Sequence, residues 1–256
     1  MRIPNLVFAI AVWSRHRDAF VNKWGAEIGG IILEPIMMLG AIGFGLGQFV
    51  AEFEEGVSYA EYVAPGILAG YTMFHALFEG TYGAYMRMSM QKVFGGILAT
   101  PVEVQDLVVG EILWGATRSF MTSIAILSVA SILGLVMSPW ALLVVPSGFL
   151  SGLAFASIAL CITGVAPTLG SLQNVFTLFA TPMFFLSGIF FPISSLPGGV
   201  QIVVWALPLT QAVHLIRGLT MGDVTITHLF AAMGLLLHIL IFGMLACVLM
   251  RRRIVV

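Results

Sequence analysis

The sequence contains very little charge. Only 9% of its 256 residues are Asp, Glu, Lys or Arg, whereas a soluble domain contains about 25%. None of these residue types occurs between Arg118 and Arg217. A lipid-facing surface must lack charge, because a charged side chain is costly in hydrocarbon. Since 59% of the residues are hydrophobic and the mean hydropathy is +1.04, we expect an all-α integral membrane protein.

Features that mark several other protein classes are also missing. The two cysteines, Cys161 and Cys247, lie in apolar runs and indicate neither a disulfide framework nor a metal site. The ATP-binding pattern G-x-x-x-x-G-K-[ST] does not occur. There is no basic patch beyond the termini, so we expect no nucleic-acid partner. The apolar run at residues 6–13 is followed by charged residues instead of a cleavage site, so we expect no signal peptide.

Residues 1–27 instead predict an amphipathic helix that lies in the membrane interface. The cations Arg15 and Lys23 lie off its apolar stripe and would face anionic lipid. The alternative is a plain cytoplasmic tail. The stripe, at helical spacing, consists of Leu6, Ile10, Trp13, Phe20 and Trp24.

Six apolar stretches are long enough to cross a bilayer, which takes roughly 20 helical residues. We expect them at residues 28–50, 63–85, 108–135, 141–165, 174–191 and 228–250. The first contains Glu34, whose carboxylate should face protein or water. The third contains Glu111 and Arg118, seven residues apart on one face, which we interpret as a structural ion pair.

Residues 192–222 interrupt this pattern. Prolines and glycines cut their apolar sequence into pieces of about eight residues, which are too short to span a membrane. Irregular backbone at membrane depth must be covered by protein or water. We therefore expect a broken, re-entrant helix pair before the last span. Its candidate residues are Pro192, Pro197, Pro208, His214 and Arg217.

The cations predict the orientation, because Arg and Lys prefer cytoplasmic loops. A seventh span would place the C-terminal arginine triplet outside. With six spans, both termini are cytoplasmic and nine of the eleven cations lie inside. These nine are Arg2, Arg15, Arg17, Lys23, Arg87, Lys92, Arg251, Arg252 and Arg253.

Five segments carry a resemblance to a known family. They are YVAPGILA (62–69), FEGTYGAYMRM (78–88), GLAFASIALCITGVAP (152–167), FLSGIFFPISSLP (185–197) and LPLTQAVHLIRG (207–218). In this order they resemble the type-2 permease subunits of ATP-binding cassette exporters, and most closely the NodJ-type lipo-oligosaccharide exporters. The likeness covers nearly the whole chain. It does not specify the cargo, since members of the family are associated with polysaccharides, teichoic acids, glycolipids and drugs.

The resemblance implies a division of labour. Two copies of such a permease work in the bacterial inner membrane, among its lipids, with two copies of a separate ATPase. ATP and Mg²⁺ bind to that ATPase, so this chain would be neither an enzyme nor a cofactor carrier.

In such permeases the loop between the second and third spans contacts the ATPase, and here this loop maps to residues 88–106. Gly95 and Gly96 should permit backbone geometry that side chains would hinder. The alternative is an ordinary solvated loop. The expected coupling residues are Lys92, Phe94, Gly95, Gly96, Ile97, Leu98, Thr100 and Pro101.

The second span carries an aromatic face at helical spacing. This face could pack or meet lipid, or it could form a stacking track for sugar rings or acyl chains. His75 and Glu79 lie one turn apart beside it and could hydrogen-bond to each other. With Glu34, they complete a candidate substrate path whose aromatic members are Tyr71, Phe74, Phe78, Tyr82 and Tyr85.

The leading function is therefore export of an amphipathic substrate: a glycolipid, lipo-oligosaccharide, polysaccharide or drug-like lipid. A proton-coupled secondary transporter using Glu34, His75 and Glu79 is the alternative, but it predicts inverted repeats, and we find no convincing internal repeat. A membrane enzyme acting on lipid-linked glycans would need clustered catalytic groups near one interface. The expected outside face offers little beyond glutamates at residues 52–61.

Overall fold

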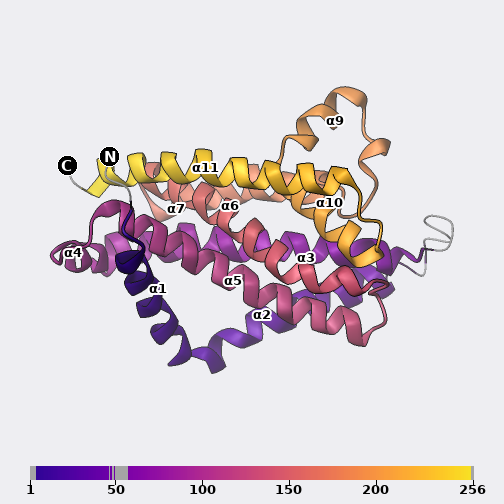
Figure 1. Ribbon diagram of the computed structural model, residues 1–256, viewed down its shortest axis with the longest axis horizontal. Coiled ribbons are helices and arrows are strands. Elements are labelled where there is room, and N and C mark those ends of the chain that lie inside the picture. Colours follow the sequence, from indigo (N-terminus) through magenta and orange to yellow (C-terminus); the bar gives the residue numbers. More distant parts are fainter. Residues whose placement is uncertain (1–3, 46, 48, 50–56, 255–256) are drawn as a thin grey trace.

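The computed structural model describes residues 4–45, 47, 49 and 57–254, and its secondary-structure elements are all helices (Figure 1). Residues 46, 48 and 50 of the expected first span and residues 51–56 of the acidic loop after it lie outside these residues. The α-helices are α1 (Leu6–Val21), α2 (Trp24–Met38), α3 (Tyr59–Phe78), α4 (Val93–Leu98), α5 (Val104–Ile132), α6 (Val144–Val165), α7 (Leu169–Val175), α8 (Thr181–Leu186), α9 (Gly198–Trp205), α10 (Pro208–Met221) and α11 (Ile226–Ile254). Shorter π- and 3₁₀-helical turns join or extend them: η1 (Leu39–Gly45), η3 (Glu79–Gly83), η4 (Met86–Met90), η5 (Pro139–Leu143), η6 (Phe176–Ala180) and η7 (Ile193–Ser195).

Four helical stretches within the described residues are long and apolar enough to cross a membrane. They are Val104–Ile132, Pro139–Val165, Leu169–Leu186 and Ile226–Ile254, and the bent pair α9–α10 makes a fifth if it counts as one span. An all-helical membrane protein with a broken helix pair is thus confirmed. The count of six spans stays a prediction, since neither α2 nor α3 is among the four.

The core forms where α3, α5 and α6 pack together. Small residues allow the backbones of α5 and α6 to approach closely, as is common between membrane helices. A Cβ atom on Gly115 would lie 2.8 Å from the Cβ of Ala156, and one on Gly152 would lie 2.6 Å from the Cβ of Ser119. Larger side chains at either glycine would therefore force the two helices apart.

The N-terminal helix α1 docks on α5 by one face. Its buried residues are Ala9, Val12 and His16, and the indole Nε1 of Trp13 donates a hydrogen bond to Thr117 Oγ1 at 2.8 Å. Leu6 and Ile10, from the predicted apolar stripe, point outward with 67% and 53% of their surfaces exposed. One side of α1 is thus fixed to the bundle, and the exposed apolar side is free to meet lipid.

The broken pair α9–α10 bends by 84° between its two helices. Pro208 occupies the first turn of α10, where its missing N–H costs nothing. Figure 1 shows α9 projecting from the bundle while α10 lies along α11, at the end of the molecule opposite α4. With 14 residues, α10 is about 21 Å long, which is less than the hydrocarbon thickness of roughly 30 Å.

This arrangement predicts which loops are accessible from each side of the membrane. A cysteine in place of Asp223, just after α10, should react with an impermeant thiol reagent applied outside. A cysteine at Lys92 beside α4, or at Val256 beyond the described residues, should not. Both native cysteines are buried, so background labelling should be low. If positions 92 and 223 label from the same side, both the six-span topology and the re-entrant pair are wrong.

Candidate functional site

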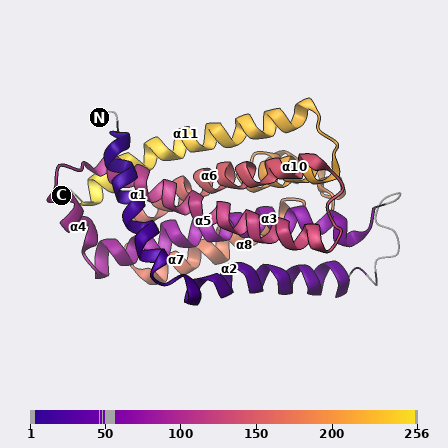
Figure 2. The same cartoon turned by 60° about the horizontal axis from the view of Figure 1, so that its bottom comes forward.

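An elongated cleft lies between α2 and the rest of the bundle. Figure 2 shows α2 running along one edge of the molecule, and it packs against α5 and α3. The cleft has a volume of about 510 Å³. A neighbouring groove of about 520 Å³ continues along α2 and shares four of its lining residues. The cleft is lined by Glu27, Gly30, Glu34, Met38, Tyr71, Phe74, His75, Phe78, Arg118, Phe176 and Phe184.

Aromatic rings from three elements form one wall of this cleft. The ring centroids of Phe74 and Phe184 are 5.2 Å apart, and those of Tyr71 and Phe74 are 6.3 Å apart. Phe78, which is 58% exposed, lies 6.4 Å from Phe176. The wall is therefore a run of flat apolar faces, of the kind against which rings and acyl chains pack.

The cleft includes only part of the predicted aromatic face of the second span. Tyr82 donates its hydroxyl to the side-chain oxygen of Gln173 at 3.0 Å. Tyr85 is buried, donates to the carbonyl oxygen of Pro167 at 3.0 Å, and lies under the guanidinium of Arg253. Neither tyrosine lines the cleft. The ring of Tyr82 nevertheless adjoins the wall, since its centroid lies 5.1 Å from that of Phe78 and 5.6 Å from that of Phe176. Packing accounts for Tyr85, whereas Tyr71, Phe74 and Phe78 border open space.

The cleft also has polar walls. Glu34 is exposed on α2 and lines both the cleft and the adjoining groove. His75 Nδ1 lies 3.0 Å from the carbonyl oxygen of Tyr71 and 3.1 Å from Thr122 Oγ1. The predicted hydrogen bond between His75 and Glu79 is wrong, because the carboxylate of Glu79 is turned toward arginines.

Arg87 is held between two carboxylates inside the bundle. Its guanidinium donates to Glu79 Oε1 at 2.7 Å and to Glu111 Oε2 at 2.6 Å. Glu111, only 2% exposed, also bonds to Nε2 of the buried His16 at 2.9 Å. Burial lowers the pKa of Arg87, but the two carboxylates outweigh burial and raise that pKa above its ordinary value. These pairs tie α1, η3, η4 and α5 together.

Arg118 extends this network to α2 and the cleft. It forms an ion pair with Glu27 of α2, and its Nε lies 3.8 Å from Glu79 Oε2. The predicted ion pair between Glu111 and Arg118 is therefore wrong, because Glu111 pairs with Arg87 and Arg118 pairs with Glu27. Glu79 opens the π-helical turn η3, and Phe176 opens the π-helical turn η6. Such turns are frequent at functional sites.

The predicted coupling loop contains a short helix, α4, that protrudes at one end of the bundle (Figure 1). Phe94 is buried, whereas Lys92, Thr100 and Pro101 are exposed and Ile97 and Leu98 are half-buried. Gly95 and Gly96 lie in α4 with ordinary backbone angles. The special geometry expected at this glycine pair is therefore wrong. Nothing lies within 4 Å of a Cβ built on either glycine, so the pair leaves a bare helical surface.

The remaining predicted residues lie at the far end of the bundle. Pro192, His214 and Arg217 line a separate cavity there, Pro197 precedes α9 and Pro208 begins α10. Sequence reasoning missed six lining residues of the cleft: Glu27, Gly30, Met38, Arg118, Phe176 and Phe184. The seven-residue spacing between Glu27 and Glu34 on α2 was the available signal for the first of them.

The long apolar helices define a class, a multi-pass, all-helical membrane protein. A sequence model of the ABC-2 type transporter family matches residues 9–221, and the chain belongs to that family. It is 36% identical over 246 residues to nodulation protein J of Rhizobium meliloti, covering 96% of this chain and 93% of that protein. It is 35% identical over 245 residues to nodulation protein J of Rhizobium leguminosarum bv. trifolii, with coverages of 96% and 93%.

The resemblance noted in the sequence is thereby confirmed, since the chain is a homologue of nodulation protein J. The membrane subunit of this family carries no ATPase domain. The chain is accordingly a transport subunit and not an enzyme, and it acts with a separate ATP-binding cassette ATPase.

The buried network makes a prediction about stability. Replacing Glu111 with Gln should leave His16 without a charged partner and Arg87 with Glu79 as its remaining carboxylate. We expect a loss of about 3–5 kcal/mol, as for other broken buried pairs, measured as thermal unfolding of the purified protein. The control is Asp18→Asn, which breaks an ion pair with Arg17 on the surface. The side chains of Asp18 and Arg17 are 63% and 50% exposed, so this change should cost less than about 1 kcal/mol of stability. Equal effects would show that the network adds no stability.

Proposed function

We propose that this chain is the permease of an ATP-driven exporter and that the cleft along α2 holds an amphipathic cargo on its way out of the cytoplasm. The observation that carries the proposal is the make-up of the cleft. Rings of Phe74, Phe78 and Phe184 face the same space as the ionisable groups of Glu34 and His75. Such a surface accommodates a molecule with both apolar and hydroxyl-rich parts.

A lipo-oligosaccharide or a related glycolipid suits this surface best. Aromatic faces accept acyl chains and the C–H faces of sugar rings in many registers, so a cargo can slide over them. The Glu34 carboxylate accepts hydrogen bonds from sugar hydroxyls. Few fixed charges face the cleft: Arg118 is already paired with Glu27 and lies beside Glu79. An ionic cargo would have to compete with these pairs.

The ATPase would dock on α4. Its bare surface at Gly95 and Gly96 lets a partner approach the backbone closely. The chain reaches α4 directly from η4, which contains Arg87, so a push on α4 acts on the ion-pair network. In the proposed assembly, two permeases and two ATPases lie in the bacterial inner membrane, with both ends of this chain in the cytoplasm. The ATPases bind ATP and Mg²⁺.

The proton-coupled alternative has less support. Its three carriers, Glu34, His75 and Glu79, do not form a connected path. Glu34 and His75 line the cleft, but Glu79 does not and is engaged by two arginines. Export driven by the partner's ATP hydrolysis requires no such path.

Alanine at both Phe74 and Phe78 tests the cargo path. We expect a folded complex with normal basal ATP hydrolysis, whose export and cargo-stimulated hydrolysis fall at least about ten-fold, since two stacking contacts are lost. The matched control is Phe120→Ala, at a ring that pairs with Phe149 on α6 and does not line the cleft. Normal export by whatever double variant survives, together with lower thermal stability, would mean that these rings only pack.

Glutamate at Gly95 or Gly96 tests the docking surface. Because a side chain at either position meets open space, the permease should stay folded while its ATPase binds about ten-fold more weakly, measured by co-purification and by ATP-driven export. The control is Gly199→Glu, an equally open position in α9 at the other end. A charge at the buried Phe94 would test folding instead. Unchanged stoichiometry and export in G95E and G96E would exclude α4 as the docking site.

A further inference from the structure

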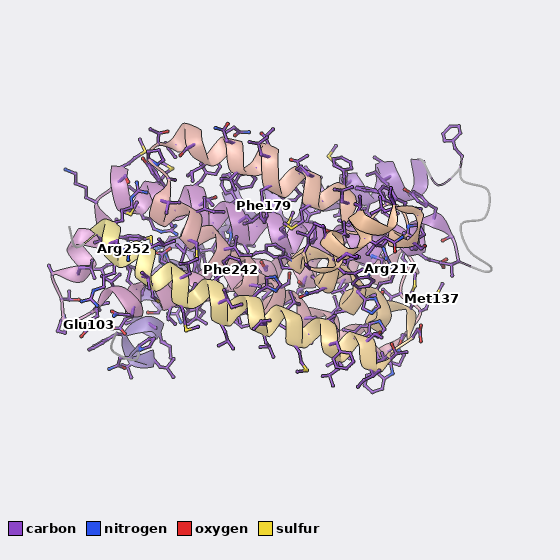
Figure 3. All side chains as sticks on the ribbon, turned by 90° about the horizontal axis from the view of Figure 1, so that it is seen from above. Glu103, Met137, Phe179, Arg217, Phe242 and Arg252 are labelled. Carbon is purple, nitrogen blue, oxygen red and sulfur yellow. The ribbon has the colours of Figure 1, made fainter. Side chains whose placement is uncertain are left out.

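A second cavity, of about 440 Å³, lies where α10, the start of α11 and residues 187–194 meet. Figure 3 shows Arg217, which lines it, at the end of the molecule opposite Glu103 and Arg252. The cavity shares no lining residue with the cleft along α2. It is therefore a separate site, on the side where the proposed topology places the outside.

The cavity carries almost no net charge. Its ionised lining residues are one of each sign, Arg217 and Asp223. The Arg217 guanidinium donates to the carbonyl oxygens of Gly188 at 2.8 Å and Tyr62 at 3.2 Å, and lies 3.9 Å from the centre of the Tyr62 ring. Its charge is thus committed to holding three segments together. A strongly anionic ligand would therefore find little to bind it.

Two buried hydroxyl groups in the cavity wall lack a partner. Ser187 and Thr210 are both 0% exposed. Within the described residues, neither Ser187 Oγ nor Thr210 Oγ1 makes a hydrogen bond, and both residues line the cavity. Buried polar side chains are nearly always hydrogen-bonded in folded proteins. Because both residues line the cavity, a ligand there can supply the partner that the protein does not.

Another part of the wall is aromatic. The imidazoles of His214 and His228 stack at 4.3 Å, and the exposed indole of Trp205 meets His214 edge-on at 5.3 Å. A hydrogen bond of 3.0 Å to Thr227 orients His214. Gly218 is required here, because a Cβ at that position would lie 2.1 Å from His228 Nε2. The rings are held in place by packing and do not depend on a ligand.

This combination matches a neutral sugar ring. Such a ring offers a C–H face for the aromatic wall, and hydroxyls that both donate to and accept from Ser and Thr. A volume of about 440 Å³ lies in the range of small-molecule sites. No three His, Cys, Asp or Glu side chains in the described part of the chain are grouped to hold a metal ion. An apolar ligand would leave Ser187 and Thr210 unsatisfied.

We infer that this cavity binds one neutral sugar ring of the exported glycan, as an exit site beyond the cleft along α2. The inference rests on the proposed function in one respect, namely that the sugar belongs to the exported cargo. Binding itself requires neither transport nor ATP. The two ideas can therefore fail separately.

The experiment uses the purified permease–ATPase complex and two probes, methyl β-glucopyranoside and the corresponding glucuronide, whose ring carries a carboxylate. Saturation-transfer NMR should show transfer to the neutral glucoside and at least several-fold less to the glucuronide. The double variant Ser187→Ala, Thr210→Val removes both unpaired hydroxyls with little change in volume. It should weaken glucoside binding about ten-fold, since two hydrogen bonds are lost.

The control is Thr220→Val. Thr220 lies on α10, as Thr210 does, but its buried hydroxyl is hydrogen-bonded within that helix and the residue does not line the cavity. It should bind the glucoside as the native protein does. Absence of transfer in the native complex would mean that only water satisfies the two hydroxyls, and would overturn the inference. Equal binding by the double variant, or equal binding of the glucuronide, would also overturn it. Loss of binding with export intact would reject the exit site alone.

Discussion

The structure depends on one constraint: a charge inside an apolar bundle must be paired. Arg87 satisfies it with two carboxylates, Glu79 and Glu111, which come from different helical segments. His16 completes the bonding of Glu111 from α1, and Arg118 reaches Glu27 on α2. Each member stabilises its neighbours. Removing one member leaves its former partner as a charge inside the bundle without that counter-charge. These pairs link α1, α2 and α5 to the turns η3 and η4, which continue α3 along the chain.

The same network limits how the cleft can open. Among the described residues, α2 packs sparsely against the bundle, so the ion pair between Glu27 and Arg118 is one of its main attachments. Both residues also line the cleft. The ion pair that attaches α2 to the bundle is therefore also part of the cleft wall. Movement of α4, which follows Arg87 in the chain, has a short physical route to that wall.

The two cavities use related chemistry at different places. The cleft combines phenylalanine rings with Glu34 and His75, whereas the second cavity combines Trp205 and two histidines with unpaired hydroxyls. Neither depends on net charge, because Arg118 and Arg217 are both engaged by the protein itself. A glycan moving from one to the other would exchange weak, replaceable contacts instead of ion pairs.

The sequence alone determined the membrane class, the family and the broken helix pair. These follow from local properties: the length of uncharged runs, the order of short motifs, and a proline that cannot continue a helix. The partners of Glu111 and Arg118 lie far away in the sequence, so local patterns did not predict them. Glu111 and Arg118 share a helix face, but the helices packed against that face supplied different partners for each.

Only the tertiary structure decided which aromatic residues border open space. A regular helix would keep Tyr71, Phe78 and Tyr85 on one face. The π-helical turn at Glu79–Gly83 has a wider hydrogen-bonding pattern and shifts the register. Tyr85 therefore turns toward Pro167, while the ring of Tyr82 stays beside Phe78. The unpaired hydroxyls of Ser187 and Thr210 were equally beyond sequence reasoning. Segments far apart in the chain bury both hydroxyls in the wall of one cavity, and the spacing of residues along the sequence does not predict such a meeting.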